Sequence, residues 1–333
     1  MSKRKLFLGL AAAALAFAGT AHAEWKPTKP IRIIVPWGAG GSTDQLVRTL
    51  AGDLEDALGQ KVVVVNQPGG AGAVGTKAAL EADKDGYTWT AGAAKDLGTY
   101  IVTGAIDTHL KDWHLFLATS NYTLVSANPD SKFQTVESII AAMKSDPGSV
   151  TIATGGINSA GGASAEALKI AVGGDYKMVT YDGGNPAVKA CVSHETELTT
   201  QLIAEQYEML RAKRLKPLAA FTVDAVDVPG IGRVESITKY LPNAKVGAVN
   251  FGIWAPKGIP QDVVDTMTEI WNTKIKTSER LAKYAASKGL GVNVMAGEAA
   301  YKQAFPTTQI NAWQIFDGGK AKVKPDTVGI PRP

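Results

Sequence analysis

The chain has 333 residues, a single cysteine and a formal net charge of +4. Three of its positive charges, on Lys3, Arg4 and Lys5, lie at the very start, so the rest of the chain is close to neutral. This balance gives no reason to expect a nucleic acid or an anionic membrane as partner. One thiol cannot form an internal disulfide, and we expect Cys191 to be a buried structural residue.

The first 23 residues have the three regions of a secretory signal peptide. The basic residues precede an unbroken apolar or small stretch from Leu6 to Ala18, and Ala21-His22-Ala23 is a small-x-small cleavage signal. The apolar stretch is too short to span a bilayer comfortably. We therefore expect residues 1–23 to be removed on export to the periplasm, which leaves a chain long enough for two domains. No twin-arginine pair is present, so export of an unfolded chain without a cytoplasmic cofactor is expected.

Strand and helix signals alternate along the rest of the chain, which predicts α/β layers with mostly parallel strands. A last helix is expected around Tyr301, Phe305 and Trp313, which recur at roughly helical spacing. The other predicted strands are 31–35, 62–65, 87–91, 115–117, 122–127, 150–153, 177–181, 215–221 and 251–254, and the other predicted helices are 44–58, 74–82, 135–145, 164–172, 186–191, 198–209 and 261–277.

Three of the predicted strands are followed by the same motif, a turn rich in Gly, Ser and Thr that leads directly into a helix. It occurs at 31–46, 150–168 and 177–190. Such a turn presents free backbone N–H groups and the positive end of a helix dipole. Because parallel α/β sheets gather these turns at one edge, the three together predict a site that favours an anion.

A series of blocks in chain order resembles the Bug family, the periplasmic solute receptors (TctC-like) of tripartite tricarboxylate transporters. Each short block is weak evidence, but the ordered set spans almost the whole chain after the signal. The blocks are Pro30-Ile31-Arg32-Ile33-Ile34-Val35-Pro36-Trp37-Gly38-Ala39-Gly40-Gly41-Ser42-Thr43-Asp44, then 63–72, 85–88, 179–187, 213–219, 228–229 and 252–260.

The resemblance implies a two-lobed periplasmic-binding-protein fold of type II, with two chain crossovers and a ligand cleft between the lobes. Lobe 1 would comprise residues 24–126 and 249–333, and lobe 2 residues 127–248. The crossovers are expected near Ser126–Pro129 and Ala248–Phe251. The family implies a monomeric receptor, not an enzyme, that needs no cofactor or metal. It would capture a small organic carboxylate, dicarboxylic, tricarboxylic or aromatic, and deliver it to membrane transporter subunits.

The family's ligand contacts map onto the three Gly-rich turns. The first turn, Pro36 to Asp44, contains no Lys or Arg, so a carboxylate there must be met by backbone N–H groups, hydroxyl groups or water. We expect Ser42 or Thr43 to be the helix N-cap. The predicted ligand-binding residues are Trp37, Gly40, Gly41, Ser42, Thr43, Asp44, Thr154, Gly155, Ser159, Tyr181, Asp182 and Gly183.

The sequence departs from the family pattern in these loops. Trp37 stands where Phe is usual, and it either packs against its own lobe or forms a wall that stacks on a flat ligand. Asp182 stands where Lys or Arg is usual, and it faces either solvent or a donor group of the ligand. Two further segments, 92–99 with Lys95 and Asp96 and the helix start at 161–164, also differ.

The same sequence also contains patterns that resemble those of other classes of protein. Gly70-Ala71-Gly72-Ala73-Val74-Gly75 fits a dinucleotide fingerprint with Asp96 downstream, which would suit a periplasmic NAD(P)-dependent oxidoreductase. Against it, Asn66 to Gly69 separate the strand from the first glycine. The sequence Gly40-Gly41-Ser42-Thr43-Asp44 is not the hydrolase motif G-x-S-x-G, and His109, Asp112 and His114 lack metal-ligand spacing. A carboxylate sensor of the same fold without a transport role stays open.

Overall fold

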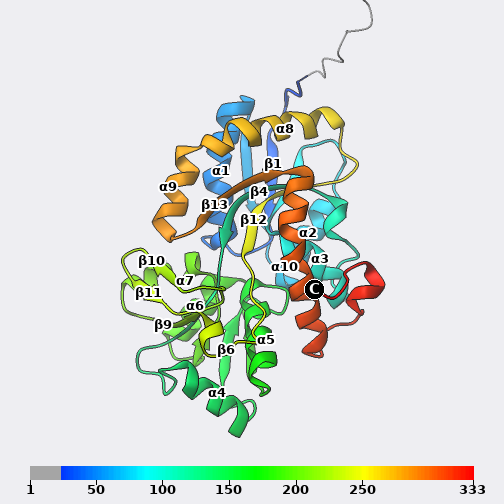
Figure 1. The fold of residues 1–333 in the computed structure, drawn as a ribbon. Coiled ribbons are helices and arrows are strands. Elements are labelled where there is room, and N and C mark those ends of the chain that lie inside the picture. The colour runs from blue at the N-terminus through cyan, green and yellow to red at the C-terminus, as the bar shows by residue number, and fades with distance from the viewer. Residues whose placement is uncertain (1–23) are drawn as a thin grey trace, which may run out of the picture.

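Two mixed β-sheets organise the protein, a computed structural model that describes residues 24–333. The expected signal peptide, residues 1–23, lies outside this range. The larger sheet forms the upper lobe in Figure 1 and the smaller sheet the lower, mostly green lobe. In the described part of the chain, no helix is long and apolar enough to cross a membrane.

The first sheet has six strands in the order β13-β4-β12-β3-β1-β2. Its core strand β1 pairs in parallel with β2 and β3, whereas β12 runs antiparallel to β3 and β4. The strands are β1 (Ile31–Val35), β2 (Val62–Asn66), β3 (Thr88–Ala93), β4 (Trp113–Asn121), β12 (Val249–Pro256) and β13 (Gly291–Ala296).

Helices cover both faces of this sheet because successive residues of a strand point to opposite sides. Ile33 belongs to the cluster that includes side chains of α1, α8 and α9, and its neighbour Ile34 to the cluster with side chains of α2, α3 and α10. The helices are α1 (Ser42–Leu58), α2 (Ala73–Leu80), α3 (Ala94–Thr103), α8 (Gln261–Thr273), α9 (Glu279–Lys288) and α10 (Gly297–Asp317).

The second sheet has five strands in the order β7-β6-β8-β5-β9. It is covered by α4 and α5 around one buried cluster and by α6 and α7 around others. Its elements are β5 (Leu124–Ala127), α4 (Val136–Ser145), β6 (Thr151–Thr154), α5 (Ala160–Val172), β7 (Lys177–Thr180), α6 (Gly184–Val192), β8 (Leu198–Thr199), α7 (Ile203–Arg211) and β9 (Lys216–Ala220), followed by the hairpin β10 (Val226–Val228) and β11 (Gly232–Val234).

The chain crosses between the sheets close to the expected places. The first crossing is at residues 122–123, a few residues before the expected Ser126–Pro129, because β4 ends at Asn121 and Leu124 already belongs to β5. The return leads into β12, which begins at Val249. Helix α10 then runs down beside both lobes and packs on α5 of the second (Figure 1).

Several expectations about the elements need correction. The strands are not mostly parallel: β12 runs antiparallel to β3 and β4, and β5 runs antiparallel to β8 and β9. The sequence could not show this, because a hydrophobic pattern indicates a strand but not its direction. The segment 198–209 is not one helix: β8 occupies its start and α7 begins only at Ile203. Helices α3 and α9 and strand β13 were not predicted. Cys191 is buried as expected, and burial raises the pKa of its thiol to about 12.

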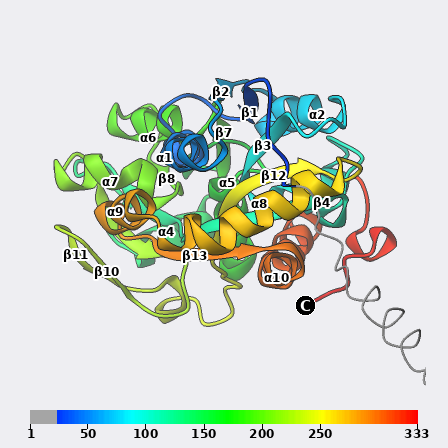
Figure 2. The ribbon, with the colours of Figure 1, turned by 90° about the horizontal axis from the view of Figure 1, so that it is seen from above.

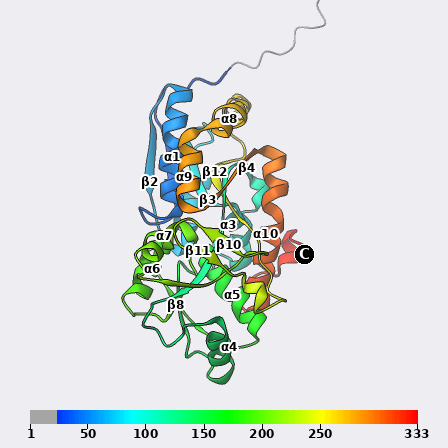
Figure 3. The ribbon, with the colours of Figure 1, turned by 60° about the vertical axis from the view of Figure 1, so that its left-hand side comes forward.

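Helix α1 points its N-terminal end at the second lobe. It is seen end-on in Figure 2, and in Figure 3 it descends from the top of the first lobe toward α6 and α7. This placement follows from the sequence, because Pro36 ends β1 and a Gly-rich turn redirects the chain into the helix. The anion-binding end of α1 therefore faces the boundary between the lobes.

Candidate functional site

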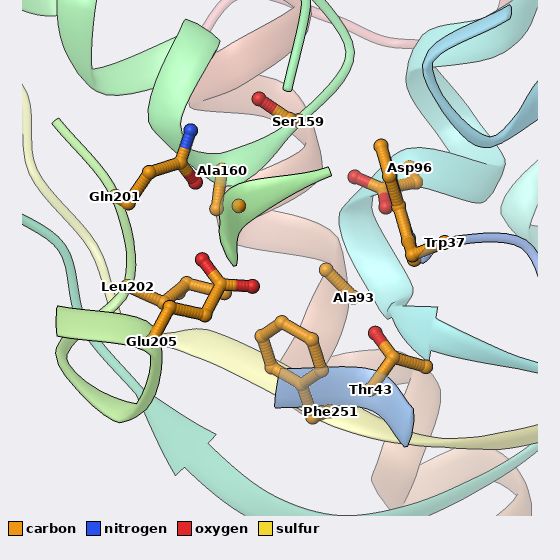
Figure 4. A pocket seen from close by; sticks show the side chains of 11 residues that line it. Trp37, Thr43, Ala93, Asp96, Ser159, Ala160, Gln201, Leu202, Glu205 and Phe251 are labelled. Atoms are coloured by element: carbon orange, nitrogen blue, oxygen red, sulfur yellow. The ribbon is translucent and has the colours of Figure 1, made fainter. Parts of the chain in front are cut away.

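A narrow cleft lies at the boundary between the lobes. Both lobes contribute to it, and Figure 4 shows their side chains pointing toward a common space. The lining residues are Trp37, Thr43, Ala93, Asp96 and Phe251 from the first sheet's lobe, and Ser159, Ala160, Gly184, Gln201, Leu202 and Glu205 from the second.

Five helices begin at this cleft. Thr43 is in the first turn of α1, Ala93 is the N-cap of α3, Ser159 the N-cap of α5, Gly184 the first residue of α6 and Leu202 the N-cap of α7. Each helix N-terminus carries N–H groups without a partner inside the helix and the positive end of a dipole. The backbone alone therefore makes the cleft attractive to an anion.

The N-cap of α1 is Gly41, so the expectation that Ser42 or Thr43 caps the helix is wrong. Helix α1 begins earlier than this expectation, directly after Gly41. A side chain of the other lobe accepts a hydrogen bond from a backbone N–H of its first turn. The N–H of Ser42 donates to Oε1 of Glu205 at 3.3 Å. Thr43 lines the cleft directly.

Asp44 holds the first turn in shape. Its carboxylate accepts hydrogen bonds from the N–H of Gly40 at 2.9 Å, from Arg48 at 3.0 Å and from the Asn66 amide at 3.0 Å. Desolvation alone would raise the pKa of Asp44, but these hydrogen bonds together lower it. Gly40 has a φ of 76°, which a side chain would strain, so the turn depends on a glycine there. Neither Gly40 nor Asp44 lines the cleft.

In the second lobe, Ser159 is the predicted residue that lines the cleft. Its hydroxyl donates to the Gly156 carbonyl at 2.7 Å and accepts from the Gly162 N–H at 2.9 Å, so it caps α5. Thr154 is buried and its hydroxyl accepts from the N–H of Gly156, which shapes the same turn. Gly155 lies behind it, and its N–H is placed to donate to the Gln201 amide oxygen at 2.9 Å.

The second turn of this lobe contacts the first lobe through its backbone. A Cβ on Gly38 would lie 3.0 Å from the carbonyl oxygen of Asp182, whose side chain is exposed. Tyr181 packs on the small residues Ala153 and Ala187. Gly183 has a φ of 118° and precedes α6. None of the three predicted residues of this turn, Tyr181, Asp182 and Gly183, lines the cleft. The backbone of the turn lies at the lobe boundary, and the next residue, Gly184, lines the cleft.

Trp37 packs on its own lobe and lines the cleft at the same time. A Cβ on Gly72 would lie 2.9 Å from the indole ring, so Gly72 leaves the space that the ring fills. Trp37 therefore both packs on its own lobe and borders the cleft (Figure 4), and its stacking on a flat ligand stays a prediction.

Three polar cleft residues were not predicted: Asp96, Gln201 and Glu205. For Asp96, the sequence indicates only a departure from the family pattern and a residue of the rival dinucleotide fingerprint, not a carboxylate-site residue. Gln201 and Glu205 lay inside what was predicted to be one helix, where a glutamate indicates nothing beyond a solvated face. Because they enter the cleft only through the packing of two lobes, no local pattern could have found them.

Asp96 and Glu205 face the cleft from opposite walls (Figure 4). Burial raises the pKa of Glu205 to about 7, and the amides of Ser42 and Leu202 offset this only in part. With its amide nitrogen turned toward Glu205, Gln201 donates to Oε2 at 3.1 Å. Burial also raises the pKa of Asp96, against the attraction of the adjacent Lys95.

Lys95 joins the lobes without entering the cleft. Its ammonium group donates to the carbonyl oxygen of Asn158 at 2.5 Å and lies 2.8 Å from Oδ1 of Asp96. The Thr103 hydroxyl also donates to the Asn158 side chain, at 3.2 Å. These contacts connect α3 of the first lobe to the loop before α5 of the second, as expected of lobes closed on each other.

The motifs considered for rival functions have structural roles in this chain. Gly75 of the glycine fingerprint sits against Pro36 and Gln67, where a Cβ would collide with the backbone. The carboxylate of Asp112 accepts the N–H of His109 at 2.6 Å and caps a short 3₁₀ turn. No cluster of three potential metal-ligating side chains occurs within residues 24–333.

Known proteins resemble this chain over most of its length. Protein BugT of Bordetella pertussis is 26% identical over 318 residues, which cover 94% of this chain and 96% of that protein. The structure of the periplasmic binding protein BugD matches with a TM-score of 0.80 at 21% identity, covering 89% of this chain and 99% of that chain. The malate-bound structure of MatC from Rhodopseudomonas palustris matches with a TM-score of 0.75 at 20% identity, covering 88% and 98%.

These structures share the fold and confirm the expected two-lobed architecture of periplasmic binding proteins. The family model described as the tripartite tricarboxylate transporter family receptor matches residues 46–315, which include every helix N-terminus at the cleft except the first residues of α1. The expected resemblance is thereby confirmed, and the chain belongs to the TctC family of tripartite tricarboxylate transporter receptors.

Proposed function

We propose that this protein is a periplasmic receptor that captures a small organic carboxylate between its lobes and delivers it to a tripartite tricarboxylate transporter. The observation that carries this proposal is the convergence of five helix N-termini on one cleft. A carboxylate bound there would be held mainly by backbone N–H groups and by the Thr43 hydroxyl. The malate in the related MatC structure is an anion of this class.

Binding is expected to close the cleft by a hinge motion at the two crossovers. Contacts such as that of Lys95 with Asn158 belong to the closed form, since they join opposite lobes. Small-angle X-ray scattering tests this. The radius of gyration should fall when a ligand saturates the protein, and an unchanged radius would count against closure.

A thermal-shift screen of organic acids tests the ligand class. A ligand present at about 100 times its dissociation constant stabilises a protein by roughly 2.7 kcal/mol, which for this length is a shift of several degrees. We expect hits among dicarboxylates, tricarboxylates or aromatic carboxylates. Shifts with amines, sugars or metal ions alone would refute the proposal, and saturable micromolar binding of NAD or NADP would favour the oxidoreductase instead.

A sensor of the same fold that has no transport role makes the same predictions for binding. Uptake of the labelled carboxylate by cells with and without the receptor separates the two functions. Loss of uptake in the deletion strain is the expected result, and unchanged uptake would favour the sensor.

A further inference from the structure

Glu205 reaches from the second lobe to the anion-binding end of a helix in the first. Its Oε1 accepts the N–H of Ser42 at 3.3 Å, and its Oε2 lies 3.1 Å from the nitrogen of the Gln201 amide. These are donors that a ligand carboxylate at the N-terminus of α1 would otherwise use. A bound carboxylate must therefore share this end of the cleft with Glu205.

No cationic side chain of the described residues lines the cleft, so only backbone N–H groups and helix dipoles offset a second negative charge there. Asp96 faces Glu205 from α3, and Lys95 is turned away toward Asn158 and Asp96. From α9, the Tyr284 hydroxyl donates to the Ser42 carbonyl at 3.5 Å, and burial raises the pKa of this hydroxyl well above its usual value. The other charged groups nearby are paired with each other: Asp44 with Arg48 on α1, and Glu208 on α7 with Lys288.

We propose that Glu205 binds the ligand as a neutral carboxylic acid, so that capture of a carboxylate is accompanied by uptake of one proton. The Glu205 carboxylate takes the proton from solvent and its new O–H donates to an oxygen of the ligand carboxylate. The Ser42 N–H then donates to the ligand. No covalent bond other than this O–H forms or breaks. The inference rests on the proposed function, since it requires a carboxylate ligand.

The chemistry of paired carboxylates supports this. Two carboxylates in one site cannot easily both stay ionised, and the pKa of one of them is strongly raised. In the ligand-free protein burial already raises the pKa of Glu205 to about 7, and a ligand anion beside it raises that pKa further. Below about pH 7 the proton is therefore present before binding. Above it, each ligand brings a proton in, and affinity falls by up to about tenfold per pH unit.

Calorimetry measures both consequences. The probe is the strongest binder among malate, succinate and benzoate, titrated at pH 6.5, 7.5 and 8.5, where these acids are ionised. Comparing two buffers of different ionisation enthalpy at each pH gives the number of protons taken up. We expect uptake to rise toward one proton between pH 6.5 and 8.5, with affinity falling roughly tenfold or more over the same range.

Glu205→Gln is the decisive variant, because an amide donates a hydrogen bond at every pH. It should take up no proton and should bind the probe more tightly than the wild type at pH 8.5. Glu208→Gln, on the exposed side of the same helix, should keep the wild-type pH profile.

Three results would overturn the inference. One is a wild-type affinity that stays constant or rises with pH. Another is a pH profile that persists in Glu205→Gln. The third is a folded Glu205→Gln variant that binds nothing, since this would mean that a neutral hydrogen-bond donor at position 205 is not enough to hold the ligand. Failure of every carboxylate to bind the wild type at any pH would instead overturn the proposed function.

Discussion

Gly184 and Glu205 fit together in the cleft because Gly184 has no side chain. A Cβ on Gly184 would overlap the carboxylate of Glu205. Gly184 begins α6 and Glu205 lies in the first turn of α7, so the two helix N-termini approach each other closely. This approach lets the acid extend from the second lobe to the N–H of Ser42 in the first.

Gly184→Ala should therefore displace the Glu205 carboxylate while leaving the protein folded, because a flexible side chain end can move aside. We expect a stability loss of no more than about 1 kcal/mol and a roughly tenfold loss of ligand affinity, equivalent to about 1.4 kcal/mol. Urea unfolding and calorimetry measure the two effects. Gly291→Ala, at a glycine where a Cβ would make only ordinary contacts, is the control. An unchanged affinity in Gly184→Ala would contradict the prediction.

The first turn of the cleft could be predicted from the sequence because local chemistry determines it. A β-branched run ended by Pro36, followed by glycines and a periodic apolar helix, specifies strand, turn and helix within about twenty residues. The same reasoning located the turns before α5 and α6, although α5 begins at Ala160 and α6 at Gly184, before the predicted starts at residues 164 and 186. Thr43, Ser159 and Trp37 consequently lie where the turn pattern indicated that a site would be.

The part of the cleft formed by Gln201 and Glu205 could not be predicted from the sequence, because its position depends on tertiary packing. Strand β8 has two residues, too few to show alternation, and its apolar Leu198 merges with the periodicity of α7. Glu205 was thereby assigned to the middle of a helix instead of to a helix start. Only the pairing of β8 with β5 and β6 shows that a new helix begins at the cleft.

Thr43→Val tests the role of the hydroxyl at the start of α1. Valine keeps the shape of threonine but removes its donor, and a hydrogen bond to a charged group contributes about 1.5–3 kcal/mol. We expect the carboxylate affinity to fall by at least about tenfold with little change in fold. Thr49→Val is the matched control, since Thr49 lies farther along α1 and its hydroxyl bonds the Gln45 carbonyl within the helix. Equal affinities for the two variants would show that Thr43 does not contact the ligand.

Glu166 should make the folded state sensitive to pH. It is buried in α5, where its Oε1 accepts the Tyr176 hydroxyl at 2.8 Å and its Oε2 has no hydrogen-bond partner. Desolvation raises the pKa of Glu166, although Tyr176 and nearby lysines oppose the shift. The folded protein therefore keeps this proton to a higher pH than the unfolded chain does, and stability is lost as pH rises through the folded pKa.

Glu166→Gln should remove that loss. The variant should be more stable than the wild type at pH 8, by about 1–3 kcal/mol, and the difference should vanish near pH 4, where both chains carry a neutral side chain. Urea unfolding across this range is the measurement. Glu269→Gln, on the exposed side of α8, should show no such trend. A variant that is less stable at pH 8 would mean that the charged form of Glu166 is the stabilising one.

Lys95→Met tests the buried pair that joins the lobes. Lys95 is 2% exposed, and its ammonium group neutralises Asp96 while bonding the Asn158 carbonyl. Methionine fills a similar volume without charge, so it leaves a buried carboxylate unpaired. Breaking a buried ion pair in this way costs about 3–5 kcal/mol, and urea unfolding should report a loss of that order. Lys26→Met, at an exposed ion pair, should change stability by less than about 1 kcal/mol.

The second substitution Asp96→Asn distinguishes the unpaired charge from lost packing. If the charge is the cause, Lys95→Met/Asp96→Asn should regain most of the stability lost in Lys95→Met, because no buried charge is left without its partner. The double variant should nevertheless stay more open in small-angle scattering, since the bond from Lys95 to Asn158 across the lobes is still missing. If the two substitutions instead destabilise the protein additively, Lys95 and Asp96 do not act as a pair, and the electrostatic explanation of this contact is wrong.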